Sequence, residues 1–106
     1  MNKFKFSKLT DNLFAAILKL DSQKEAERFF RDLCTAEELK EMADRFEIAR
    51  LVAQNLPYRE IARKLKTSTT TVGRVAMWLN NGEGGYKLAL AKMAAHHNSP
   101  KNPRQS

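Results

Sequence analysis

The chain has 106 residues, of which 42% are hydrophobic and 29% charged, with four Gly, three Pro and one Cys. This length and balance predict one domain with a modest core, and the lone Cys34 excludes a disulfide framework. The few Gly and Pro residues and the absence of strand-like alternation predict an all-α fold. The net charge of +7 indicates either a polyanionic partner or simply a basic, solvated surface.

The basic excess lies in the second half of the chain. Residues 51–106 carry nine basic and two acidic residues, whereas residues 21–50 carry six basic and nine acidic ones. The N-terminus MNKFKFSKL has no continuous apolar segment of the kind found in signal peptides, and the longest apolar run, LFAAIL, is too short to cross a membrane. We expect a soluble cytoplasmic protein with no membrane partner.

Three helices are predicted in the first half. Residues 1–8 form an arm, and a first helix spans about 10–20, with apolar residues along one face. Ser22 and Glu25 have the spacing of a capping box, which starts a short helix that ends near Leu33. The longest helix, about 36–55, is apolar on more than one face, so one small chain cannot cover it and a homodimer is expected.

The segment 58–79, YREIARKLKTSTTTVGRVAMWL, has the spacing of a helix-turn-helix. Ile61 and Leu65 of the first short helix face inward. The turn falls at about Lys66–Ser68, with Ser68 as the N-cap of the second helix. Apart from its arginine, the stretch TSTTTVGR consists of poor helix formers, and it suits a helix that presents short polar side chains to a major groove.

Threonine carries a hydroxyl that can donate or accept and a methyl that can touch thymine, and Gly73 allows a close approach of backbone and DNA. We therefore predict that the second helix reads base edges and that basic residues beside it contact phosphates. The DNA-binding residues expected on this basis, together with the cap, are Arg59, Lys64, Lys66, Ser68, Thr69, Thr70, Thr71 and Gly73.

The last predicted helix spans about 86–97, which gives a single domain over residues 1–97 and a polar, disordered tail over 98–106. His96 and His97 are neighbours on a helix, so they point about 100° apart and suit one metal ion poorly. No nucleophile–base pair, metal motif or phosphate-binding loop is present. We expect no cofactor, no metal and no enzymatic activity.

The chain resembles the Trp repressor superfamily, most closely its YerC/YecD-type Trp-repressor-like proteins. The resemblance covers about residues 9–97 and is sharpest in LCTAEELKEMADRFEIARLV and YREIARKLKTSTTTVGRV. It implies an intertwined homodimer of six-helix chains, in which the fourth and fifth helices read DNA. Arg59, Thr69, Thr70, Thr71 and Gly73 match the DNA-facing region of the family.

The resemblance also implies a possible ligand pocket, made of Thr35, Arg45, Arg74, Val75 and Trp78. In the tryptophan-binding repressor two arginines enclose the ligand, and Arg45 and Arg74 match them. That repressor has glycine and serine where this chain has Val75 and Trp78. We therefore expect Trp78 to fill part of the pocket with its own indole, or alternatively to be a core residue under the last helix, and L-tryptophan to bind weakly or not at all.

Two classes of function remain. The first is a DNA-binding transcriptional regulator, with double-stranded DNA as its partner and a repressor as the expected form. Within this first class, the alternative is a transposon-associated DNA-binding protein. The second class is a helical protein–protein interaction module. The basic residues 51–106 favour DNA, because phosphate contacts make binding strongly salt-dependent.

Overall fold

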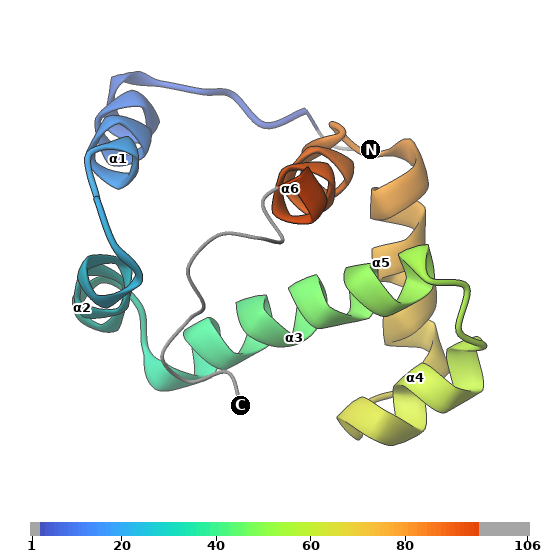
Figure 1. Cartoon of the computed structure of the whole chain (residues 1–106). Helices are drawn as coiled ribbons and strands as arrows, with labels where there is room; N and C mark the ends of the chain where they lie inside the picture. The colour runs from blue at the N-terminus through green and yellow to red at the C-terminus, as the bar shows by residue number, and fades with distance from the viewer. Residues whose placement is uncertain (1–2, 96–106) are drawn as a thin grey trace. The chain divides into compact units, whose positions relative to one another are not determined.

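The computed structural model describes residues 3–95, and over this range it consists of six α-helices with no strand (Figure 1). The helices are α1 (Lys8–Leu18), α2 (Gln23–Leu33), α3 (Ala36–Ala53), α4 (Tyr58–Leu65), α5 (Thr69–Asn81) and α6 (Gly85–Ala95). The predicted all-α class is confirmed. The predicted tail and His96 and His97 lie outside the described residues. The chain forms two compact units that meet between Ala36 and Glu37, and each is described by itself.

In the first unit, α1 begins two residues earlier than predicted, because Ser7 is an unrecognised cap. The Ser7 hydroxyl accepts the Thr10 N–H at 3.4 Å, and the Thr10 hydroxyl accepts the Ser7 N–H at 2.8 Å. This is a reciprocal capping box in which Thr10 replaces the usual Glu or Gln. The predicted box at the start of α2 is confirmed in one half. Ser22 accepts the Glu25 N–H at 3.1 Å, but the Glu25 carboxylate accepts from Asp21 instead of Ser22.

The apolar side chains of the first unit remain largely uncovered. Neither α1 nor α2 contains a buried residue, and Leu9 and Leu18 are 80% and 83% exposed. Burial of a leucine side chain is worth about 1.5–3 kcal/mol. The exposed apolar surface of α1 and α2 therefore favours association with another protein surface.

The second unit contains the core of the described chain. Its buried residues come from the second half of α3 and from both helices that follow: Ile48, Ala49, Leu51, Ile61, Ala62, Val72 and Val75. Tyr86 of α6 packs against this cluster. In Figure 1 the chain passes from the end of α3 through α4 and returns across α3 as α5. The core therefore fixes the helix-turn-helix against the long helix.

The long helix ends at Ala53, two residues before the predicted end, because Asn55 adopts a left-handed conformation (φ 67°) ahead of Pro57. Asparagine is among the residues that tolerate this region best. Only the second half of α3 is buried; in the first half Met42 is 37% exposed. The apolar surface that the sequence predicts on more than one face of this helix is therefore partly exposed to solvent in a single chain.

Candidate nucleic-acid interface

The helix-turn-helix lies where the sequence predicts it. Helices α4 and α5 are joined at Lys66–Ser68, and α5 begins at Thr69. Lys66 ends α4 in the left-handed region (φ 55°, ψ 48°), and the Thr67 N–H donates to the Ala62 carbonyl at 2.9 Å. This bond is the six-residue closure of a Schellman motif, which usually has glycine at the left-handed position.

The two helices are held together by small and β-branched side chains. Ile61 and Val72 are fully buried, and Ala62 and Val75 are 7% and 3% exposed. The small Ala62 allows a close crossing, and the valines anchor the inner face of α5. This burial offsets the poor helix propensity of the threonines, which costs only a few tenths of a kcal/mol for each residue.

The first turn of α5 presents hydroxyl groups on its outer side. Ser68 accepts the Thr71 N–H at 3.0 Å, and the two hydroxyl oxygens lie 3.0 Å apart. Thr71 is partly covered, whereas Thr69 and Thr70 are exposed. The hydroxyls of Thr69 and Thr70 are therefore the more accessible ones. The space where a side chain at Gly73 would begin is empty, with no atom within 4 Å.

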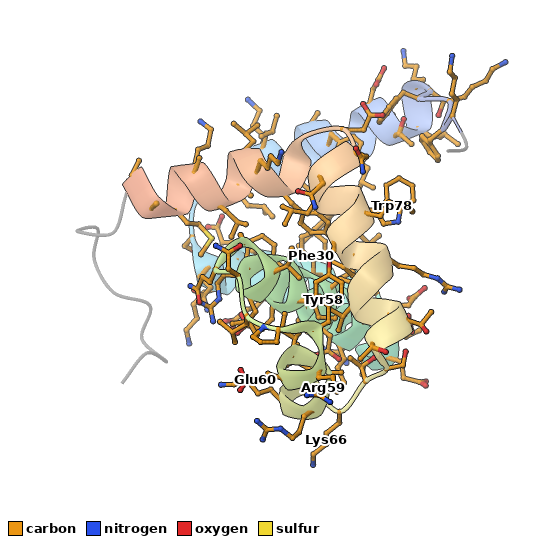
Figure 2. The ribbon with its side chains drawn as sticks, turned by 90° about the vertical axis from the view of Figure 1, so that its right-hand side faces the viewer. Phe30, Tyr58, Arg59, Glu60, Lys66 and Trp78 are labelled. Carbon is orange, nitrogen blue, oxygen red and sulfur yellow. The ribbon has the colours of Figure 1, made fainter. Side chains whose placement is uncertain are left out.

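Cations surround this turn. Arg59, Lys64 and Lys66 are exposed, and Figure 2 shows Arg59 and Lys66 toward the same end of the second unit. Arg63 is exposed on the same short helix and was missed as a site residue. The available signal was the basic content of residues 58–74, which holds five basic residues and one acidic residue, Glu60.

One of these cations already has a negative neighbour. The pKa of Glu47 on α3 is lowered, first by a hydrogen bond from Arg50 and further by the positive charges of Arg50 and Lys64. Arg50 donates to Glu47 through Nε at 2.8 Å and Nη2 at 2.6 Å. The positive charges of Arg50 and Lys64 thus both favour the ionised form of Glu47.

The predicted ligand-pocket residues are not gathered around one cavity in the second unit. Arg45 lines a cavity of about 190 Å³ together with Glu41, Asp44, Ile48, Leu65, Thr67 and Thr71. Val75 is buried in the core, Arg74 is exposed, and Thr35 belongs to the first unit.

Trp78 is 42% exposed, and it is not among the residues that line the cavity beside Arg45. Figure 2 shows its side chain on the outer side of α5. Trp78 is therefore not one of the buried core residues of the described chain. The spacing of residues along α5 does not predict which other parts of the protein pack against Trp78.

The described residues contain no group of three His, Cys, Asp or Glu side chains placed to hold a metal ion. Over the same part of the chain, no helix has the length and hydropathy needed to cross a membrane.

The fold and this interface define a small helix-turn-helix protein, and comparison with known proteins gives the family. Residues 8–94 match the model of the Trp repressor protein family. YerC of Bacillus subtilis (strain 168), an uncharacterized protein, is 40% identical over 83 residues, which are 78% of this chain and 80% of YerC.

Two solved structures are similar over most of their length. A TrpR-like protein from Eubacterium eligens ATCC 27750 matches with a TM-score of 0.80 and 36% identity, over 83% of this chain and 91% of that one. A protein from Staphylococcus aureus assigned to the Trp repressors matches with a TM-score of 0.79 and 33% identity, over 92% and 93% of the two chains. The chain therefore belongs to the Trp repressor family, and the resemblance seen in its sequence is confirmed.

Proposed function

We propose that the protein is a sequence-specific DNA-binding transcriptional regulator, acting as a repressor, which inserts the first turns of α5 into the major groove. The observation that carries this proposal is the division of α5 into two sides. Val72 and Val75 are buried, while Thr69 and Thr70 are exposed at its capped start. Helices that read the major groove use their N-terminal residues in this way.

Phosphate contacts come from the basic residues on either side of the turn, chiefly Arg59, Arg63 and Lys66. These residues set orientation and affinity, whereas the threonines read sequence. The family is one of regulators, and no cofactor or catalytic step is needed for this function. A DNA partner places the protein in the cytoplasm of a bacterial cell.

The functional form in this proposal is a homodimer. The uncovered apolar side chains of the first unit and of the start of α3 support it: Leu9, Phe14, Leu18, Leu33 and Met42 are each at least 37% exposed. A second copy of the chain would cover them. Two-fold symmetry then predicts a pseudo-palindromic site with half-sites about one helical turn apart.

The test is selection of bound genomic fragments by the purified protein, followed by fluorescence anisotropy on the selected duplex over a range of salt concentrations. We expect a preferred palindromic sequence, and a fall in log affinity with log salt that is steep because several phosphates are neutralised. Sedimentation of the free protein should give a dimer. Salt-independent binding, or a folded monomer at high concentration, would contradict the proposal and favour a protein–protein module.

A further inference from the structure

A groove of about 660 Å³ lies on the second unit, apart from the cavity beside Arg45. It is bounded by the end of α3, the start of α4, the last turn of α5 and the first half of α6. It is lined by Val52, Ala53, Asn55, Leu56, Pro57, Tyr58, Leu79, Asn80, Lys87 and Leu90. Its volume is within the range of small-molecule sites, about 300–1,000 Å³. None of these residues belongs to the predicted DNA contacts or to the predicted ligand pocket.

The lining combines apolar walls with a few polar groups. Val52, Leu56, Leu79 and Leu90 provide aliphatic surface, and Asn55, Asn80 and Tyr58 provide amide and phenol groups. Tyr58 is 44% exposed and lies apart from Arg59 and Lys66 in Figure 2. The lining therefore offers aliphatic surface and polar groups side by side, which suits a small organic molecule that has both an apolar body and a polar group.

The charges of the lining have one sign. Lys87 is the single charged side chain among the lining residues, and none of them is a carboxylate. The start of α4 adds positive potential, because its N-cap, Pro57, forms no side-chain hydrogen bond to the first N–H groups of the helix.

The C-terminal ends of α3 and α5 oppose this, since each helix end carries about half an elementary charge. The partial positive charge at the start of α4 roughly cancels the partial negative charge at the end of α3. The full charge of Lys87 then exceeds the remaining half charge at the end of α5, so the groove favours an anion.

We infer that this groove binds a small apolar monoanion, a carboxylate on an aromatic or aliphatic body. The carboxylate pairs with the Lys87 ammonium, and the apolar body lies against Leu56, Leu79 and Leu90. The inference does not depend on the proposed DNA-binding function. A bound molecule would touch the start of α4 and the end of α5 together, which are the two outer ends of the helix-turn-helix.

The test uses two probes of nearly equal shape, sodium 2-naphthoate and neutral 2-naphthamide, titrated into the full-length ¹⁵N-labelled protein. We expect 2-naphthoate to shift the amide signals of Asn55, Tyr58, Asn80 and Lys87 with a saturable, one-to-one profile, and to bind more tightly than 2-naphthamide. Shifts elsewhere, equal affinity for the two probes, or no shifts because a second copy of the chain closes the groove would each overturn the inference.

Three variants sharpen the test. Lys87→Gln should weaken 2-naphthoate about fivefold, the upper range for one exposed ion pair, and leave 2-naphthamide unchanged. Lys92→Gln removes a lysine from the same helix that does not line the groove, and should change neither affinity. Ala53→Leu adds volume at an exposed wall position and should weaken both probes. If Lys87→Gln and Lys92→Gln behave alike, the groove does not select an anion.

Discussion

Ser68 and Thr71 meet at the start of α5, where the Ser68 hydroxyl oxygen lies 3.0 Å from both the Thr71 amide nitrogen and the Thr71 hydroxyl oxygen. Ser68→Ala should lower the free energy of unfolding by about 0.5–2 kcal/mol, because the first turn loses its cap. Urea denaturation measures this change.

Ser68→Asp is the matched variant. An aspartate caps as well as a serine and favours the helix dipole, so stability should be kept. Its charge should weaken DNA binding, because it lies beside phosphates in the proposed complex. Unchanged DNA affinity for Ser68→Asp would place the start of α5 away from DNA.

Lys66 occupies a backbone conformation that suits glycine better, with φ at 55°. Lys66→Gly should relieve about 1 kcal/mol of strain and stabilise the protein, whereas Lys66→Ala keeps the strain. In the proposed complex both variants remove one phosphate contact, so both should weaken all DNA sequences similarly and reduce the salt slope by about one unit. A slope unchanged in both variants would show that Lys66 does not contact a phosphate.

Substitution of Gly73 should change stability and DNA affinity in opposite directions. A Cβ at this position meets no atom within 4 Å, so Gly73→Ala should stabilise α5 by about 0.5–1 kcal/mol through lower backbone entropy in the unfolded chain. DNA affinity should fall if the backbone approaches the groove here. Thermal unfolding and anisotropy measure the two effects.

Gly82→Ala is the contrasting control. A Cβ there would lie 2.4 Å from the carbonyl oxygen of Trp78, so this variant should be destabilised. Gly73→Ala with full DNA affinity would contradict a close approach of the backbone.

Local signals in the sequence predict most of the helix-turn-helix. The turn at Lys66–Ser68 and the Ser68 cap depend on residues within four positions of one another, and both are confirmed. The start of α1 was placed too late because Thr10 is an unusual partner in a capping box. The end of α3 was placed too late because helical periodicity continues through Asn55, and only the backbone shows the left-handed turn there.

The candidate ligand pocket could not be predicted in the same way. Spacing places Val75 and Trp78 on one side of α5, but it does not specify what packs against that side. The core covers Val75 and leaves Trp78 exposed. The groove beside Lys87 joins residues about 35 positions apart in the sequence, and no short motif marks it.

The Glu47–Arg50 pair should make the free energy of unfolding depend on pH. The pKa of Glu47 in the folded protein is below its ordinary value of 4.5. Its contribution is therefore complete above about pH 4.5 and is lost as the pH falls through the lower, folded value. The pair is partly exposed, so its worth is at the surface-pair level of about 0.2–1 kcal/mol.

A double-mutant cycle with Glu47→Gln and Arg50→Gln, measured by urea unfolding at pH 7 and at pH 3, checks this. The coupling energy should be positive at pH 7 and smaller at pH 3. An equal coupling at both values would mean that packing, and not the charge of Glu47, links the two residues.

L-Tryptophan should bind weakly or not at all, and DNA binding should not require it. The isopropyl group of Val75 is packed in the core, 3% exposed. The family resemblance implies that the tryptophan-binding repressor has a smaller residue, glycine, at this position. Arg45 has Glu41 and Asp44 beside it in its small cavity, and these carboxylates disfavour the carboxylate of an amino acid. In the dimer, Arg45 and Arg74 would flank Trp78 or hold a smaller anion. Titration calorimetry measures the affinity.

The double variant Val75→Gly with Trp78→Ser restores the small residues and, where circular dichroism shows it folded, should bind L-tryptophan more tightly than the natural chain. Micromolar binding by the natural chain, together with tryptophan-dependent DNA binding, would show that the pocket is open and that Val75 and Trp78 do not block it.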